Sequence, residues 1–412
     1  MFDWMRGFAP EERRTFVAAF GGWTMDAMDY MVFSFVIPSL LTLWKISSGE
    51  AGLLATVTLL ISAFGGWIAG ALADRFGRVR VLQFTILWFA IFTCLNGFAT
   101  GFGTLFTTRA LQGFGFGGEW AVGSVLVGEI IHADHRGKAV GTLQSGWAVG
   151  WGMAAVLYAL FYSILPEEIA WRALFWVGLA PALLVFYVRR YVPEPEIFNQ
   201  TRRRIATGGR STFLDIFSPQ LLATTAFACL LATGAQGGYY AITTWLPTFL
   251  RTVRKLTVLN SSGYLAVIII GSFAGYLTSA WLNDRIGRRA SFALFAVCSA
   301  VTVVAYMVLP VNDAMMLVLG FPLGFFASGI FSGMGPFMTE LFPSRVRGSG
   351  QGFCYNFGRG IGALFPTLVG YLSASMGLGA AIGLFAVIAY GLVLVAVAML
   401  PETRGKQLLA YE

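Results

Sequence analysis

The sequence predicts an all-α membrane protein with twelve transmembrane helices, arranged as two six-helix bundles related by pseudo-two-fold symmetry. The composition is the first reason: 57% of the 412 residues are hydrophobic and only 12% are charged, against about 25% charged in an ordinary soluble protein. Long uncharged stretches and short repeated motifs are the other two. A chain this apolar could not cover a water-exposed surface with polar groups, which excludes a cytosolic enzyme and a disordered protein.

The uncharged stretches define the individual helices, since a helix needs about 20 residues to cross the hydrocarbon core. Seven stretches contain no Asp, Glu, Lys or Arg, namely 51–73, 81–108, 139–166, 216–250, 256–283, 290–312 and 314–339. Stretches 15–44 and 104–128 carry two charges each, 348–401 carries one and is long enough for two helices, and 171–192 completes the set. The predicted helices are 16–44, 51–73, 80–100, 104–130, 139–163, 171–192, 219–250, 261–283, 290–309, 314–339, 349–372 and 378–400.

The distribution of Lys and Arg predicts the orientation. With the N-terminus inside, the cytoplasmic segments hold 21 of the 28 Lys and Arg residues, the outer loops hold five, and two lie within helices. Cytoplasmic loops are enriched in Lys and Arg. We therefore expect an integral protein of the plasma membrane, the inner membrane in a bacterium, with both termini in the cytoplasm. The same bias accounts for the net charge of +8, so no nucleic-acid partner is needed to explain it.

Three repeated signatures predict two parallel halves. Asp74-Arg75-x-Gly77-Arg78 recurs as Asp284-Arg285-x-Gly287-Arg288, Glu129 and Arg136 recur as Glu340 and Arg347, and Pro193-Glu194 recurs as Pro401-Glu402. We expect an N-terminal six-helix bundle at 1–192, a cytoplasmic linker at 193–218 and a C-terminal six-helix bundle at 219–412. Such an architecture places a binding site between the halves near the middle of the membrane.

Several motifs carry a family resemblance. Gly70-x-x-x-Asp74-Arg75-x-Gly77-Arg78 resembles the signature loop of the major facilitator superfamily, with Val79 and, in the repeat, Ala280 as departures. Arg109-x-x-Gln112-Gly113-x-Gly115 resembles its proton-linked fourth-helix motif, and Pro401-Glu402-Thr-Arg404-Gly resembles the terminal motif of sugar and organic-acid porters. More narrowly, the chain resembles the sialate, aromatic-acid and lactate/pyruvate proton symporters in Trp23-Thr-Met-Asp26-Ala-Met-Asp29, Gly117-Gly118-Glu119 and Tyr239-Tyr240…Trp245-Leu-Pro247. The resemblance implies secondary transport coupled to protons and leaves the substrate open.

Five ionisable side chains lie inside predicted helices, where a charge is costly and marks a functional position. The acids Asp26, Asp29 and Glu119 outnumber the bases Arg109 and Arg359. Because each arginine stays charged, two acids can be held ionised and the third is left to bind a proton. An anion that docks on an arginine would displace its acidic partner, so proton and anion would bind together. The alternative is a static salt-bridge network that only fixes helix packing.

Arg359 and Arg109 are the candidates for binding the anion. Tyr355 and Arg359 share a face of the eleventh helix with Asn356 beside them, and a guanidinium flanked by a phenol and an amide suits a carboxylate. Arg109 is expected to pair with Asp26 or Asp29, both of which can face the cavity. The resemblance to sugar and acid porters places further polar contacts there, namely Tyr30, Gln144, Gln236 and Tyr240.

Charged residues at the cytoplasmic helix ends are expected to gate the pathway without touching substrate. They are Asp74, Arg75, Arg78, Glu129, Arg136, Asp284, Arg285, Arg288, Glu340 and Arg347. Asp74 and Asp284 are expected to cap helix N-termini of the opposite half and to pair with loop cations, which would close the inner face.

Together these features predict a proton-coupled symporter that imports an organic anion, such as a monocarboxylate, an aromatic acid or a sialic acid, by alternating access. A proton-independent facilitator or exporter is the rival. A membrane sensor or receptor is more remote, because the longest segment outside the helices is 193–218. We expect no enzymatic activity, metal or cofactor, since the helices show no nucleophile–base pair or metal-binding cluster. A monomer in contact with membrane lipid suffices.

Overall fold

A computed structural model describes residues 8–130, 133–192, 213–343 and 346–405. Within these ranges, the side chains of 71, 74, 75, 78, 119–130, 133–141, 189, 190 and 213 fall outside the description. All regular structure in the described ranges is helical.

Seven helices form the six membrane-spanning segments of the first half. They are α1 (Pro10–Leu43), α2 (Ser48–Phe76), α3 (Arg78–Asn96), α4 (Phe102–Ile130), α5 (Ala133–Ile164), α6 (Glu167–Val177) and α7 (Ala182–Tyr191). The predicted helix at 171–192 thus begins earlier and is interrupted between α6 and α7. Pro181 immediately precedes α7. Proline has no backbone N–H to continue the preceding helix, which explains the break. Helices α6 and α7 together form the sixth membrane-spanning segment.

The second half contains more breaks. Its elements are η2 (Phe213–Phe217), α9 (Leu222–Thr248), η3 (Phe249–Val253), α10 (Val258–Ile286), α11 (Arg288–Met307), α12 (Asp313–Gly329), η4 (Ile330–Gly333), α13 (Met334–Leu341), α14 (Arg347–Gly362), α15 (Leu364–Met376) and α16 (Leu378–Met399). The predicted helix at 349–372 divides at Ala363, where Pro366 cannot donate a hydrogen bond to the carbonyl of Gly362. The predicted helix at 314–339 is interrupted by the 3-10 turn η4.

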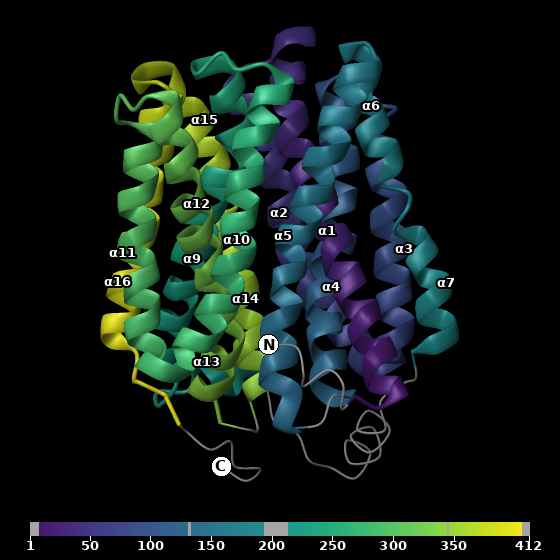
Figure 1. The fold of residues 1–412 in the computed structure, drawn as a ribbon. Coiled ribbons are helices and arrows are strands. Elements are labelled where there is room, and N and C mark those ends of the chain that lie inside the picture. Colours follow the sequence, from purple (N-terminus) through teal and green to yellow (C-terminus); the bar gives the residue numbers. More distant parts are fainter. Residues whose placement is uncertain (1–7, 131–132, 193–212, 344–345, 406–412) are drawn as a thin grey trace.

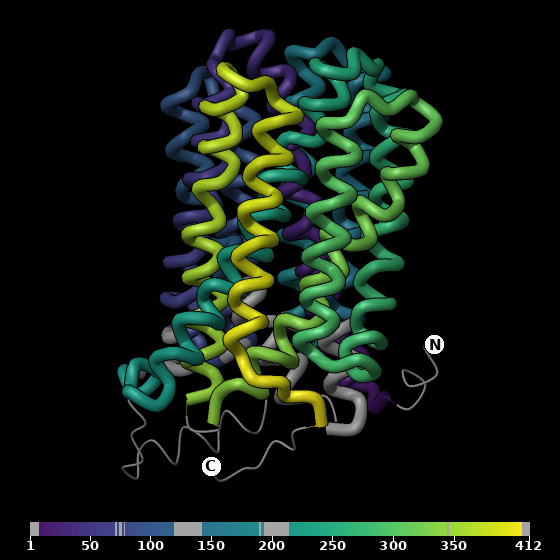
Figure 2. Tube along the Cα trace, turned by 90° about the vertical axis from the view of Figure 1, so that its left-hand side faces the viewer, coloured from purple at the N-terminus to yellow at the C-terminus, as the bar shows by residue number. Residues whose placement is uncertain are grey.

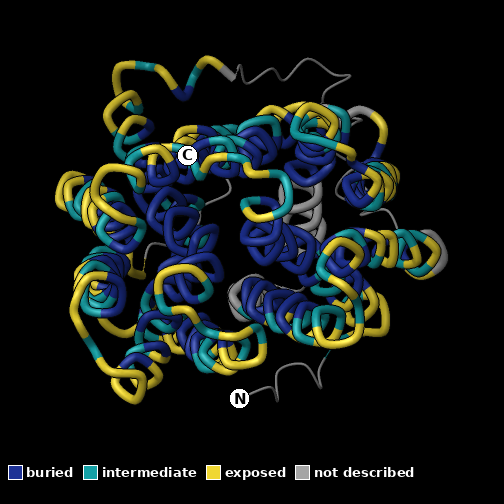
Figure 3. The backbone as a smooth tube through the Cα atoms, turned by 90° about the horizontal axis from the view of Figure 1, so that it is seen from above, coloured by how far each residue is buried: buried dark blue, intermediate teal, exposed yellow. Residues whose placement is uncertain are grey.

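The outer surface of the bundle is apolar, as a lipid-facing surface should be. Nine helices in the described part of the chain are long and apolar enough to cross a membrane; α4, α9 and the α14–α15 pair supply the other three predicted spans. Exposed residues ring the outside and buried residues fill the centre (Figure 3). Leu183 and Phe186 are each 70% exposed. Large apolar side chains at this exposure are stable in contact with lipid rather than water.

The two halves stand side by side, with their helices running in the same general direction (Figures 1 and 2). They meet where α2 packs on α14 and α15, α5 packs on α10, and α1 packs on α9. Helix α1 begins and α16 ends at the lower end of Figure 1, which we call the lower end; the opposite end is the upper end. The predicted fold class is confirmed, and the exact domain boundaries stay a prediction.

The repeat is visible in the backbone as well as in the motifs. Gly77, between α2 and α3, and Gly287, between α10 and α11, have φ values of 108° and 96°. Only glycine adopts these values without strain, which explains the glycine in each copy of the motif. Lys45 and Lys255, in the loops that precede α2 and α10, likewise share the left-handed backbone, with φ of 52° and 54°.

Candidate functional site

Arg359 is buried between the two halves with part of its guanidinium unsatisfied. It belongs to α14 and is 1% exposed. Its Cζ lies 5.1 Å from the ring centroid of Tyr355 and 5.4 Å from that of Phe116, on α4 of the other half. In the described part of the chain, neither Nε nor Nη1 has a hydrogen-bond partner. A buried donor left unpaired costs about 1–3 kcal/mol, so the residues around Arg359 leave part of its guanidinium unstabilised.

Asp26 supplies a negative charge near this arginine. It is fully buried on α1 of the first half, and its charge interacts with that of Arg359 on the second half. The sequence predicted that Arg109 pairs with one of the two first-helix acids, Asp26 or Asp29. In the structure, Arg359 has an acid of the opposite half within electrostatic reach.

Arg109 lies within the first half. Its Nε donates to the carbonyl oxygen of Leu54 on α2 at 2.9 Å, and its Nη1 donates to Oε1 of Gln112 at 3.4 Å. Its Cζ lies 3.7 Å from the ring centroid of Phe33 on α1. Gln112 in turn donates to Thr93 on α3. Arg109 therefore binds three helices of its own half, and its predicted contact with substrate stays a prediction.

Asp29 is associated with this second arginine. Its charge interacts with that of Arg109. Its Oδ1 lies so close to the backbone between α6 and α7 that a Cβ added to Gly178 would come within 3.0 Å of it. The sequence allowed Asp26 and Asp29 to face one cavity together. In the structure the charge of Asp29 interacts with Arg109 and that of Asp26 with Arg359, and the shared cavity stays a prediction.

Aromatic side chains from both halves gather beside Arg359. We call Tyr30, Phe116, Trp147, Tyr239 and Tyr240 the central aromatic cluster. In the first half, the ring centroid of Tyr30 lies 6.2 Å from that of Phe116 and 5.7 Å from that of Trp147. Across the interface, Tyr30 lies 5.8 Å from Tyr240, and Nε1 of Trp147 donates to the hydroxyl of Tyr239 at 2.7 Å. The cluster thus joins α1, α4 and α5 to α9.

The polar residues predicted to line the site connect α9 with α14. The hydroxyl of Tyr240 donates to Oε1 of Gln236 at 3.1 Å, and Nε2 of Gln236 donates to the backbone oxygen of Tyr355 at 2.8 Å. Asn356 lies against α2, where a Cβ added to Gly66 would be 2.7 Å from its Oδ1. Gln144 is buried on α5. Five of the predicted contacts, Tyr30, Gln236, Tyr240, Tyr355 and Asn356, therefore lie at or next to the interface.

A polar cluster closes the upper end. Nη1 of Arg251, in η3 of the second half, lies 3.5 Å from Oε1 of Glu167 at the start of α6. Ser39 on α1 donates to the same carboxylate oxygen at 2.7 Å, and its hydroxyl is 2.7 Å from that of Tyr162 on α5. A second link lies between α2 and α15, where the Thr56 and Thr367 hydroxyls are 2.6 Å apart. These contacts were not predicted from the sequence, although Glu167 and Arg251 are opposite charges at the ends of their helices.

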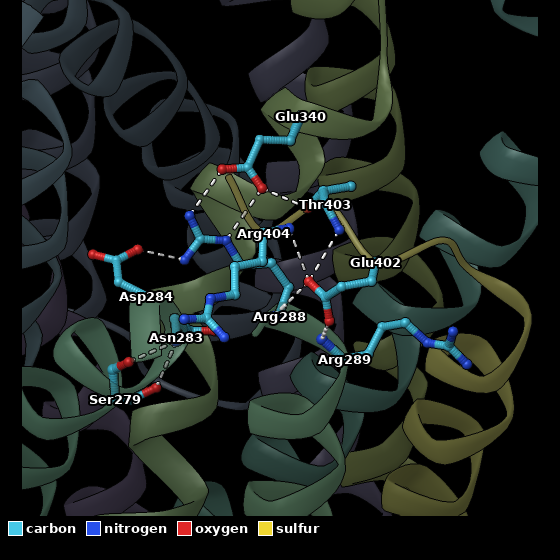
Figure 4. A network of polar contacts seen from close by, with 9 residues as sticks. All are labelled: Ser279, Asn283, Asp284, Arg288, Arg289, Glu340, Glu402, Thr403 and Arg404. Atoms are coloured by element: carbon cyan, nitrogen blue, oxygen red, sulfur yellow. Dashed lines mark hydrogen bonds and ion pairs between the residues drawn. The ribbon is translucent and has the colours of Figure 1, made fainter. Parts of the chain in front are cut away.

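The lower end of the second half is held by a network of charged residues (Figure 4). Arg288 binds Glu340 at 2.8 Å and Asp284 at 2.7 Å. Glu402, just after α16, accepts hydrogen bonds from the backbone N–H groups of Arg288 and Arg289, which begin α11, and from those of Thr403 and Arg404. Partial burial opposes ionisation of Glu402, but these four donors outweigh it and lower the pKa of this carboxyl below its ordinary value.

These contacts place some of the predicted gating residues. Asp284 binds Arg288 of its own half rather than a helix of the opposite half, because Arg288 lies one turn further along the chain. Arg285 lies over the ring of Trp281, and Arg347 donates to the backbone oxygen of Thr339. The side chains of Asp74, Arg75, Arg78, Glu129, Arg136 and the proposed proton carrier Glu119 lie outside the described residues.

Sequence reasoning missed three parts of this arrangement. It did not single out Phe116 or Trp147, because aromatic residues are common in membrane helices. It used Glu402 only as a motif and did not connect it with α11. The role of Glu402 could have been inferred from the repeat, because a Pro-Glu pair follows each half, as Pro193-Glu194 and as Pro401-Glu402. No group of three His, Cys, Asp or Glu side chains in the described ranges could hold a metal ion.

Known proteins resemble this chain over nearly its whole length. The family model of the Major Facilitator Superfamily matches residues 18–311 and 264–410. A probable 4-methylmuconolactone transporter of Cupriavidus pinatubonensis is 43% identical, over 98% of this chain and 94% of that protein. The cis,cis-muconate transport protein of Acinetobacter baylyi is 30% identical, over 88% and 89%.

The fold is shared with a solved structure at low sequence identity. A proton:xylose symporter of the same superfamily, bound to 6-bromo-6-deoxy-D-glucose, superimposes with a TM-score of 0.75 at 16% identity. The alignment covers 97% of this chain and 98% of the symporter. From the twelve-helix fold, the repeated motifs and these matches, we conclude that the chain belongs to the Major Facilitator Superfamily and is a transporter, not an enzyme.

Proposed function

We propose that the protein is a proton-coupled symporter that imports an organic anion and binds its carboxylate through Arg359. The observation that carries this proposal is the buried guanidinium between the halves, whose Nε and Nη1 have no hydrogen-bond partner among the described residues. A guanidinium offers a carboxylate two parallel donors. The relatives named above are a probable 4-methylmuconolactone transporter and a cis,cis-muconate transport protein, and the second of these cargoes is an anion.

Asp26 provides the coupling to protons. Its negative charge interacts with that of Arg359 across the interface. A substrate carboxylate that binds Arg359 takes over this role and leaves Asp26 buried without its counter-charge. Because an uncompensated buried charge costs several kcal/mol, Asp26 then takes up a proton. Substrate and proton therefore enter the site together.

The second arginine, Arg109, compensates the negative charge of Asp29 within the first half. Arg109 is held by Leu54, Gln112 and Phe33 and is associated with Asp29. This pair fixes one acid in its ionised form, so Asp26 is the better candidate for the acid that changes protonation. Glu119 remains a candidate from the sequence alone.

Alternating access follows from the packing of the halves. Contacts through Glu167, Arg251, Thr56 and Thr367 close the upper end. Rocking of the halves about the central site would break these contacts and open that end. From the Lys and Arg distribution we propose that the lower end, with both termini, faces the cytoplasm of a bacterial inner membrane.

Purified protein in liposomes tests this function. Addition of a carried acid outside the vesicles, with a pH-sensitive dye inside, should acidify the lumen in proportion to uptake. Uptake without proton movement would instead identify a facilitator. Efflux driven by an inward proton gradient would identify an exporter.

A further inference from the structure

An open cavity lies at the lower end of the first half, where α1 begins and α7 ends (Figure 1). It has a volume of about 490 Å³, and its lining consists of Phe8, Pro10, Arg13, Arg14, Val17 and Tyr187. Helices α1 and α7 pack against each other beside it. The volume is within the range of small-molecule sites, and none of the lining residues belongs to the central site around Arg359.

One face of α1 supplies most of the lining. Pro10, Arg13, Arg14 and Val17 are spaced i, i+3, i+4 and i+7, which are the positions that share one face of an α-helix. The two acids in the first turn of α1 do not line the cavity. The carboxylate of one of them, Glu12, accepts a hydrogen bond at 2.9 Å from the backbone N–H of the residue before α1. The face toward the cavity is therefore positively charged.

Both guanidinium groups of this face can bind an anion. Arg13 and Arg14 are exposed, and the ion pairs of the described residues include neither of them. The Cζ of Arg14 lies 5.5 Å from the ring centroid of Tyr191, which lies 5.0 Å from that of Tyr187. A cation–π contact restrains the guanidinium without using its N–H donors. A phosphate group is the anion that adjacent arginines bind well.

Apolar side chains continue from this charged end toward the middle of the membrane. Val17 is 46% exposed, and Leu183 and Phe186 on α7 are each 70% exposed. Leu183 lies one turn before Tyr187 on α7, about 5 Å further from the lower end. A positive end that adjoins an exposed apolar face fits a ligand with an anionic head and a hydrocarbon tail. A small soluble anion would use only the positive end.

We propose that this cavity binds an anionic phospholipid, with its phosphate held by Arg13 and Arg14 and an acyl chain lying along Val17 and Leu183. Basic sites between transmembrane helices at the cytoplasmic side bind acidic lipid headgroups. The lower end is the side to which the Lys and Arg distribution assigns the cytoplasm. The inference goes beyond the proposed function, because the lipid contacts α1 and α7 of one half and does not touch the central site.

Native mass spectrometry of the purified full chain in detergent tests this site. Dioleoyl phosphatidylglycerol and dioleoyl phosphatidylcholine have the same acyl chains and differ in headgroup charge. We expect one phosphatidylglycerol to bind about 10- to 30-fold more tightly than phosphatidylcholine, since each arginine near the membrane surface contributes about fivefold. Inorganic phosphate at the same concentration should not displace it, because phosphate lacks the acyl chains.

Variants locate the binding. Arg13→Gln combined with Arg14→Gln should weaken phosphatidylglycerol binding by about 10- to 30-fold and leave phosphatidylcholine binding unchanged. Arg13→Lys combined with Arg14→Lys keeps the charge and should keep most of the preference. Arg80→Gln combined with Arg404→Gln is the matched control. It removes two exposed arginines from the lower end outside the cavity and should change the affinity by at most about twofold.

Each contrary result overturns the site. Equal affinity for the two lipids, or an equal loss in the glutamine variant and in the control, excludes a headgroup site at Arg13 and Arg14. A lysine variant as weak as the glutamine variant excludes charge as the cause. Displacement by inorganic phosphate assigns the cavity to a soluble anion and overturns the lipid. None of these measurements involves uptake, so they leave the proposed function to its own test in liposomes.

Discussion

The guanidinium of Arg359 in the second half lies 5.4 Å from the ring of Phe116 in the first half. Arg359, which we propose to bind the substrate, therefore belongs to the second half and packs against an aromatic ring of the first half. A ligand bound at Arg359 contacts both halves, so its presence can be transmitted to the opening and closing of either end.

Replacing Arg359 should weaken anion binding. Arg359→Gln removes the charge and the donors, and we expect affinity to fall by about 10- to 100-fold, because hydrogen bonds to charged groups contribute about 1.5–3 kcal/mol. Arg359→Lys keeps the charge but loses the forked geometry and should be intermediate. Calorimetry on both variants measures this. Arg80→Gln, at an exposed position on α3, should bind normally; full affinity in Arg359→Gln would place the anion elsewhere, with Arg109 the next candidate.

Asp26→Asn should separate substrate movement from proton movement. The amide cannot accept a proton, so uphill uptake driven by a pH gradient should stop while exchange of internal for external substrate continues. Uptake and exchange of a radiolabelled acid in liposomes measure the two processes. Asp313→Asn, at an exposed helix start, is the control. Retained uphill uptake in Asp26→Asn would assign the proton to another acid, and Glu119→Gln is then the variant to compare.

The voltage dependence of uptake should reveal the number of protons. One proton carried with a monoanion moves no net charge, so only the pH gradient contributes, at about 1.4 kcal/mol per pH unit. A second proton would add about 2.3 kcal/mol per 100 mV. We expect uptake of a monocarboxylate to be insensitive to a potassium diffusion potential. Strong stimulation by an inside-negative potential would contradict the one-proton mechanism.

Removal of the Glu167–Arg251 ion pair should loosen the upper end. A cysteine at Thr56, in a variant without the four native cysteines, would report on opening through its reaction with a membrane-impermeant thiol reagent. Because the pair is partly exposed, Glu167→Gln should raise the labelling rate by at most about fivefold. Glu168→Gln changes the exposed neighbour and should have no effect. If both variants label equally fast, the ion pair does not hold the ends together.

Glu402 should make stability depend on pH. Its folded-state pKa is lowered by four backbone donors, two of them at the start of α11. Its contribution is therefore present above the ordinary glutamate pKa of about 4.3 and lost as the pH falls through the folded-state value. At neutral pH, Glu402→Gln should lower the stability by about 1 kcal/mol, the upper range for an acid at an exposed helix N-terminus. Thermal unfolding in detergent should show this difference shrinking in acid; a difference independent of pH would exclude the charge as its cause.

Much of the site could be predicted from residue type and position. Arg359 was identified because a charge within an apolar helix is too costly to lack a function, and Gln236 and Tyr240 because the resemblance to sugar and acid porters places such polar groups in the cavity. Asp26 and Asp29 were identified in the same way as Arg359, and Arg109 was predicted to pair with one of them, but the sequence did not say which. Three residues apart on α1, the two acids have similar environments in the sequence, and only the packing of α6, α7 and α9 against α1 distinguishes them.

Residue order alone was enough to predict the membrane-spanning segments, the repeat and the ionisable side chains within those segments. Uncharged runs of about 20 residues have one stable form in a bilayer, since a helix satisfies its backbone groups within the segment. Which residues are in contact depends on the packing of the helices. Trp147 contacts Tyr239, Glu167 contacts Arg251, and Glu402 contacts the start of α11. Such contacts depend on how helices distant in sequence are rotated and packed, and the local pattern of a single helix does not contain that information.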